Sequence, residues 1–297
     1  MSKKSNSLFF GAATAIVTPF CHGEIDYDTL GDMIDFQVKN SIDALVVSGT
    51  TGEASTLSDE EYRSLISFSA KRIGGKVPLI AGSGSNDTQK AKRLTRIATE
   101  LGADACLVVT PYYNKATPRG LVESYREIAS STNLPIIVYN VPTRTCVNIS
   151  IESYRQLAKI ENIVAVKEAS PDISACAELI FELGDLLDVY TGSDDQLLPT
   201  LSLGGKGIIS VASNIIPREC HDICYDHLEG NICEAREEFK KYFKLMQAMF
   251  CEVNPIPVKT ALSILGRCRE EFRLPLCSIS DGNRDKLANI MKSLSLI

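Results

Sequence analysis

The sequence lacks three features that would point to common classes of function. No apolar run is long enough to cross a bilayer, since the longest near the N-terminus, residues 8–20, contains Gly, Thr and Pro. Basic residues are not in excess, because 31 Lys and Arg stand against 37 Asp and Glu, for a net charge of -6. Histidines number only three. These absences argue against a membrane partner, a nucleic-acid partner, and a Ser-His-Asp or Cys-His mechanism.

The chain also lacks a recognisable secretory signal, because no small-residue cleavage pattern follows the apolar run at 8–20. We therefore predict a cytoplasmic protein. Ten cysteines are present, and in a chain of 297 residues without such a signal they are interpreted as reduced thiols that serve as small apolar residues.

One cluster has the residue types of a metal site: Cys220, His221, Cys224, His227 and Cys233. Its spacing matches no standard zinc pattern. Cys220, Cys224 and His227 fall on one face of a helix, so a buried helix face is the favoured interpretation. We predict no metal.

What the sequence does contain is a repeat of short, apolar, β-rich runs separated by helical patterns. Their spacing averages roughly 27 residues, which fits a strand, a loop, a helix and a return loop. Near-continuous apolar strands that alternate with helices indicate a parallel sheet. The eight runs lie at residues 12–20, 43–50, 77–84, 103–113, 134–142, 162–170, 187–194 and 204–213.

Eight such units predict an α/β fold, a (β/α)₈ TIM barrel, over residues 1–228. A doubly wound open sheet is the alternative, but it usually has fewer strands and a nucleotide fingerprint, of which "GSGSND" at 82–87 carries only the first two glycines. Later residues show helical patterns only, so 229–297 are predicted to form a C-terminal helical extension that packs on the barrel or on a neighbouring subunit.

The run at 162–170 carries Lys167 at its end, where barrels place their catalytic groups. Lys167 shares its parity with Ile163 and Ala165, and Tyr139 shares its parity with Ile137 on the preceding run. If these parities face the interior, the two side chains come from adjacent strands about 4.8 Å apart.

A lysine held among apolar side chains has its charged form disfavoured, which leaves a neutral amine to attack a carbonyl and form a Schiff base. A tyrosine hydroxyl within reach could shuttle the protons. The alternatives are a lysine whose tip reaches solvent or pairs with a carboxylate, and a core tyrosine with a satisfied hydroxyl. Glu168 has the opposite parity and is predicted to be a structural hydrogen-bonding partner behind the barrel.

An ordered set of segments lies at the predicted strand ends and in the C-terminal part: "GTTGE" (49–53), "TPYYN" (110–114), "YNVPTRT" (139–145), "VKEAS" (166–170), "TGSDD" (191–195), "GIISV" (207–211) and "NPIPVK" (254–259). As a set, these segments resemble the dihydrodipicolinate synthase family of pyruvate-dependent class I aldolases, which also includes N-acetylneuraminate lyase. The resemblance covers nearly the whole chain. It implies a lyase that condenses pyruvate with L-aspartate 4-semialdehyde to 4-hydroxy-tetrahydrodipicolinate in lysine and diaminopimelate biosynthesis, with no cofactor beyond the covalent imine of pyruvate.

The resemblance also implies catalytic roles for four residues. Lys167 would form the imine with pyruvate, and Tyr139 would be the acid and base. Thr50 would link Tyr139 to Tyr113 in a hydroxyl relay, with Tyr113 donated across a subunit interface. A homo-oligomer is therefore expected, by resemblance a homotetramer built as a dimer of dimers.

The substrate-binding residues are likewise implied by the resemblance. Thr51 would hold the pyruvate carboxylate beside the backbone near Gly192 and Ile209. Arg144 would bind the carboxylate of the semialdehyde, a task suited to a planar bidentate donor. The presence of Arg144, and "GTTGE" in place of "GSTGE", favour a synthase over a sialic acid lyase.

Two other hypotheses stay open: a 2-oxo-acid aldolase that uses pyruvate with a different aldehyde, and a barrel that binds an oxo acid without turning it over.

Regulation also differs from the resembled pattern. Lysine-inhibited members have a serine, two histidines and a glutamate at an interface effector site, beside an asparagine and a tyrosine that this chain keeps as Asn86 and Tyr112. We expect weak or absent lysine inhibition, because the positive charge of Lys90 stands where a carboxylate would otherwise meet the amine of the effector. The substituted positions are Ala54, Asp59, Tyr62 and Lys90.

Overall fold

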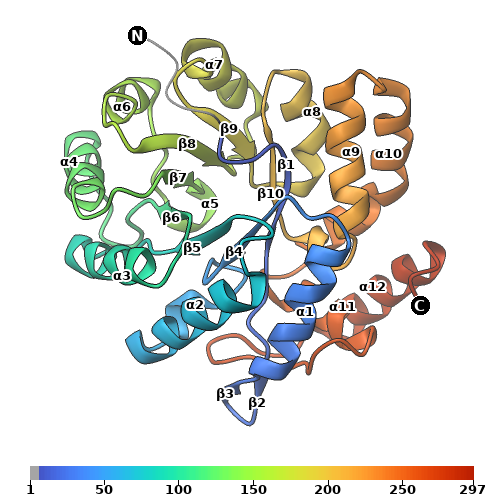
Figure 1. Cartoon of the computed structure of the whole chain (residues 1–297). Helices are drawn as coiled ribbons and strands as arrows, with labels where there is room; N and C mark the ends of the chain where they lie inside the picture. Colours follow the sequence, from blue (N-terminus) through green and yellow to red (C-terminus); the bar gives the residue numbers. More distant parts are fainter. Residues whose placement is uncertain (1–6) are drawn as a thin grey trace.

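Eight parallel strands close into a barrel with helices around it, in a computed structural model that describes residues 7–297 (Figure 1). The predicted (β/α)₈ fold is confirmed, and each barrel strand overlaps one of the eight predicted runs. The strand order around the barrel is β1-β10-β9-β8-β7-β6-β5-β4. The strands are β1 (Gly11–Ala15), β4 (Ala44–Val47), β5 (Leu79–Gly82), β6 (Ala105–Val109), β7 (Ile136–Asn140), β8 (Ile163–Glu168), β9 (Asp188–Thr191) and β10 (Gly207–Ser210).

The surrounding helices begin where the sequence offers capping residues. Ser58 accepts a hydrogen bond from the Glu61 backbone N–H, and the Glu61 side chain accepts one from the Ser58 N–H, which forms a capping box. Within residues 7–297 no helix has the length and apolar character needed to cross a bilayer. The helices are α1 (Tyr27–Lys39), α2 (Asp59–Ile73), α3 (Thr88–Glu100), α4 (Pro118–Ala129), α6 (Ile151–Leu157), α7 (Ile173–Leu183), α8 (Leu197–Ser202) and α9 (Pro217–Glu229).

Three further helices follow the barrel: α10 (Ile232–Ala248), α11 (Ile256–Ile264) and α12 (Asp281–Ser293). Helix α10 packs on α9, and α12 contacts both α10 and α11 (Figure 1). The segment between α10 and α11 returns to the barrel mouth, because Asn254 bonds to Thr51 there. The C-terminal helices therefore reach the end of the barrel where the strands terminate.

Several short elements were not predicted. Strands β2 (Phe20–Cys21) and β3 (Glu24–Ile25) form a small antiparallel hairpin, and α5 (Pro142–Thr145) is a single turn that follows β7. Elements of two to four residues are too short to show a hydrophobic periodicity, so the sequence pattern does not predict them. Helix α5 matters for the site because it carries Arg144.

The barrel interior corrects one expectation about side-chain parity. Ile137, Tyr139 and Ala165 belong to the apolar cluster inside the barrel, whereas Ile163 packs in the outer layer between strands and helices. The expectation that Ile163 faces the barrel interior together with Lys167 is wrong. Ile136 pairs with Ile163 while the next residue, Ile137, pairs with Ala165, so the strand pairing shifts by one residue between them. This register shift places one extra residue on β8, and only the residues after it keep the parity of Lys167.

Candidate active site

Lys167 and Tyr139 lie directly opposite one another on neighbouring strands β8 and β7. The Lys167 Nζ atom lies 4.4 Å from the centroid of the Tyr139 ring. Both side chains are buried, with 5% and 7% of their surface exposed. The barrel register thus brings together an amine and a phenol in one apolar interior.

Burial changes the protonation of Lys167. Burial is the main cause of a fall in the pKa of the amine from 10.5 to about 8. The negative charge of buried Asp194 raises this pKa, and the positive charge of Arg144 lowers it. At pH 7.5 roughly a quarter of the amine is then neutral, compared with about one in a thousand for a lysine in water. A neutral amine is the nucleophilic form, so the site favours attack on a carbonyl carbon.

Burial also disfavours the charged form of Tyr139, which is the deprotonated phenolate. It raises the pKa of the phenol, and Arg144 and a hydrogen bond with Thr50 oppose that rise. Tyr139 therefore keeps its proton at neutral pH. A phenol that holds its proton beside an amine that partly loses its own is a suitable pair for an acid-catalysed addition to a carbonyl.

A cavity of about 490 Å³ opens in front of these two residues. Arg144 reaches it from α5, and its Nη2 donates to the Asn254 carbonyl oxygen at 3.0 Å. Glycine is needed at position 192, because a Cβ atom there would lie 2.7 Å from the Lys167 Cε and 2.8 Å from the Cβ of Ala169, which cannot rotate away. Six of the eight candidate residues line this cavity: Lys167, Tyr139, Thr50, Thr51, Arg144 and Gly192.

Two candidate residues are not brought to the cavity by this chain. Tyr113 is 92% exposed and has a left-handed backbone, with φ of 70°. Ile209 is fully buried inside the barrel, and neither residue is among the described residues that line the cavity. A single chain therefore does not complete the proposed relay.

Glu168 lies on the other side of β8, as its parity predicted. Its carboxylate accepts hydrogen bonds from Asn140 Nδ2 and the Tyr154 hydroxyl at 3.0 Å, and from the Ser170 backbone N–H at 2.8 Å. Burial raises its pKa, and these bonds counter the rise. The prediction of a structural partner is confirmed.

Four members of the cysteine and histidine cluster lie on helix α9, and the fifth, Cys233, lies on α10. Cys220 and Cys224 are fully buried in the outer apolar layer. Across residues 7–297, no three His, Cys, Asp or Glu side chains are arranged to hold a metal ion.

Comparison with known proteins decides the family. A model of the dihydrodipicolinate synthetase family matches residues 8–294. The chain belongs to this family. A 4-hydroxy-tetrahydrodipicolinate synthase of Aquifex aeolicus is 47% identical over 290 residues, which are 97% of this chain and 99% of that protein.

Solved structures agree with the family assignment. The crystal structure of dihydrodipicolinate synthase from Aquifex aeolicus has a TM-score of 0.95 at 46% identity, over 97% of this chain and 99% of that one. A chloride-inhibited dihydrodipicolinate synthase from Acinetobacter baumannii, complexed with pyruvate, has a TM-score of 0.95 at 39% identity, over 97% and 99% of the two chains. The prediction of a synthase of this family is confirmed, and the comparisons favour it over the aldolase with a different aldehyde.

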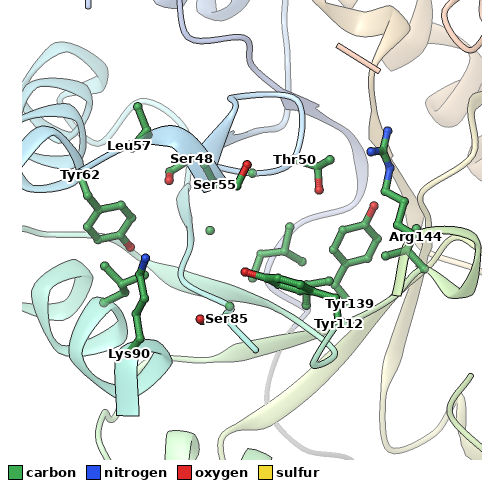
Figure 2. A pocket seen from close by; sticks show the side chains of 18 of the residues that line it. Ser48, Thr50, Ser55, Leu57, Tyr62, Ser85, Lys90, Tyr112, Tyr139 and Arg144 are labelled. Carbon is green, nitrogen blue, oxygen red and sulfur yellow. The ribbon is translucent and has the colours of Figure 1, made fainter. Parts of the chain in front are cut away.

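A second cavity, of about 270 Å³, adjoins the first and shares Thr50, Tyr139 and Arg144 with it. At its far end Tyr62 and Lys90 point toward one another from α2 and α3 (Figure 2). The Tyr62 hydroxyl is buried there and has no hydrogen-bond partner within residues 7–297. The effector positions identified by resemblance that line this cavity are Ala54, Asp59, Tyr62, Lys90 and Tyr112, whereas Asn86 is not among the described lining residues.

Sequence reasoning missed the contribution of the C-terminal segment to the site. Asn254 and Glu252 line the cavity in front of Lys167, as does Asp195, which belongs to the "TGSDD" segment. The motif "NPIPVK" was the available signal for Asn254, but a motif does not show which cavity a residue reaches.

Proposed function

We propose that this chain condenses pyruvate with L-aspartate 4-semialdehyde, using Lys167 as the nucleophile, and that it needs no external cofactor. The observation that carries the proposal is a buried lysine with a pKa of about 8 beside a buried, protonated tyrosine. This pair can form and resolve an imine without histidine or metal. The 2-oxo acid with a free methyl group that suits such chemistry is pyruvate.

The steps follow from the positions of the two groups. The neutral Lys167 amine adds to the C2 carbonyl carbon of pyruvate, and the oxygen on C2 takes a proton from Tyr139. The resulting carbinolamine loses water to give the imine. Removal of a C3 proton gives an enamine, whose C3 attacks the aldehyde carbon of the semialdehyde. Tyr139, as phenol and then phenolate, donates and recovers the proton at each stage.

Substrate binding is assigned to the remaining cavity residues. Thr51 holds the pyruvate carboxylate beside the backbone near Gly192 and Ile209. Arg144 binds the carboxylate of the semialdehyde through its planar guanidinium group.

The proposal includes an oligomer, because Tyr113 must be supplied to Thr50 and Tyr139 from another subunit. The 92% exposure of Tyr113 supports this arrangement, since a side chain so exposed is free to enter a partner's site. We assign a homotetramer built as a dimer of dimers. We also assign residues 1–228 to the catalytic barrel and 229–297 to a C-terminal helical extension.

The test is condensation of pyruvate with L-aspartate 4-semialdehyde, followed as NADPH oxidation through a coupled dihydrodipicolinate reductase. A sustained rate is expected from the native chain, and none from Lys167→Ala. Borohydride should trap labelled pyruvate on the native chain and not on Lys167→Ala. Trapped pyruvate without turnover would mean that the aldehyde partner is wrong, and a retained label in the variant would place the nucleophile elsewhere.

A further inference from the structure

Asn254 connects the two groups that the proposed function assigns to the two substrates. Its Nδ2 donates to the Thr51 Oγ1 at 3.0 Å, and its backbone carbonyl accepts from the Arg144 Nη2 at 3.0 Å. The residue is only 6% exposed and lies between α10 and α11. One residue of the C-terminal segment therefore contacts both the proposed pyruvate side and the proposed semialdehyde side.

This segment is held firmly against the loop that carries Thr51. Lys259, on α11, pairs with Glu53 at 2.5 Å, and both side chains are almost completely buried. Glu53 follows Thr51 by two residues and also accepts from the Arg273 backbone N–H at 3.1 Å. The position of Asn254 relative to Thr51 is thus set by a buried ion pair nearby.

The side chain of Asn254 still has an unused acceptor. Its Oδ1 is buried and has no hydrogen-bond partner among residues 7–297, while Asn254 lines the same cavity as Lys167. A buried acceptor without a donor is unfavourable and rare in folded proteins. In a substrate cavity, a donor on the substrate is the natural partner.

The chemistry of the two substrates decides which one supplies that donor. Pyruvate at neutral pH has only acceptor oxygens. The semialdehyde carries an ammonium group on the same carbon as its carboxylate. If Arg144 holds that carboxylate, the ammonium group lies next to the residue to which Arg144 is bonded, which is Asn254.

We propose that Asn254 is a substrate-recognition residue whose amide oxygen accepts a hydrogen bond from the amino group of the semialdehyde. This inference rests on the proposed function. It makes the C-terminal segment responsible for preferring an aldehyde that bears an amino group. The Nδ2 bond adds a second effect, because Thr51 accepts from Asn254 and so keeps its own proton for the pyruvate carboxylate.

Two carboxylates also line the cavity and are the competing acceptors. The Glu252 Oε1 already accepts from the Ser280 N–H and hydroxyl and from Asn283 Nδ2. Asp195 is half-buried and has no such set of bonds within the described chain. Asp195→Asn is therefore the matched control, since it removes a charge from the cavity without touching Asn254.

The experiment compares L-aspartate 4-semialdehyde with succinic semialdehyde, the same aldehyde without the amino group, at saturating pyruvate. The KM of the first and the inhibition constant of the second are measured for the native protein, Asn254→Ala, Asn254→Asp and Asp195→Asn, and the KM of pyruvate is measured separately at saturating L-aspartate 4-semialdehyde. In Asn254→Ala the KM should rise about tenfold, as expected for one lost hydrogen bond to a charged group, with less than a twofold change in the inhibition constant. Asn254→Asp keeps an oxygen in place and should keep the preference, but it should raise the KM of pyruvate because Thr51 then donates to it. Asp195→Asn should keep the native ratio.

Borohydride trapping of pyruvate on Lys167 shows that each variant is folded, and it makes the outcomes separable. Equal rises of both constants in Asn254→Ala would reduce Asn254 to a positioning residue and overturn the inference. Loss of the preference in Asp195→Asn alone would assign the amino group to Asp195. If the native protein traps pyruvate but does not use the semialdehyde, the proposed function itself fails, and the inference fails with it.

Discussion

Replacing Lys167 by methionine should stabilise the protein while abolishing its activity. Lys167 is 5% exposed, and the buried Asp194 carboxylate offsets only part of the cost of burying its charge. Its pKa is lowered from 10.5 to about 8, chiefly by burial. A charged amine is thus held in the barrel against its own preference, and methionine fills a similar volume without a charge.

The magnitude follows from the pKa values. A fall from 10.5 to about 8, at 1.36 kcal/mol for each pKa unit, costs the folded state about 3 kcal/mol when the unfolded lysine is protonated. The folded pKa lies below the unfolded one, so the cost is complete below about pH 8, shrinks as the pH rises further, and vanishes above about pH 10.5. The advantage of Lys167→Met should therefore be about 3 kcal/mol at pH 7 and small at pH 10.5.

The assay is urea-induced unfolding of both proteins at several pH values and at one matched protomer concentration, since oligomerisation also affects stability. Lys259→Met is the matched comparison. Lys259 is also fully buried, but it is paired with Glu53, so its loss leaves a buried carboxylate unpaired and should destabilise by about 3–5 kcal/mol.

Two buried lysines should thus respond with opposite signs. A Lys167→Met variant that is no more stable than the native protein at pH 7 would refute the reasoning. A stability difference that stays constant between pH 7 and pH 10.5 would refute it equally, because the effect would then not come from the ionisation of Lys167.

Three further outcomes are expected. Arg144→Ala should leave pyruvate trapping on Lys167 largely intact while the use of semialdehyde falls by about tenfold or more, since a charge-assisted bond to its carboxylate is lost; equal loss of both steps would indicate a structural role. The rate of pyruvate imine formation should rise with pH through about 8, because the neutral fraction of Lys167 rises there; a profile that is flat from pH 7 to 9 in borohydride trapping would contradict this. Lysine should inhibit weakly or not at all, because Lys90 lies in the second cavity and repels the amine of the effector. The Lys90→Glu variant should bind lysine more tightly than the native protein. Half-inhibition of the native protein at sub-millimolar lysine would contradict the prediction.

Local pattern alone was enough to predict the barrel and the facing of Lys167 and Tyr139. The strands recur at a regular spacing, and each strand alternates its side chains with a period of two, so both features are written in residues close together in the chain. Even here one detail escaped, because the register shift near Ile163 depends on how β7 and β8 pair and not on β8 itself.

The tertiary structure alone decided three features of the site. They are the exposure of Tyr113, the need for glycine beside the Lys167 side chain, and the position of Asn254 in the cavity. Asn254 and Thr51 are 203 residues apart in sequence, and no periodicity or propensity extends over such a distance. Their contact exists because closure of the barrel brings the ends of separate strands to one rim, and because the buried pair of Lys259 and Glu53 holds the C-terminal segment there. The residue types of the proposed reacting pair are thus a local property of the chain, whereas the contact between Asn254 and Thr51 depends on packing between its distant parts.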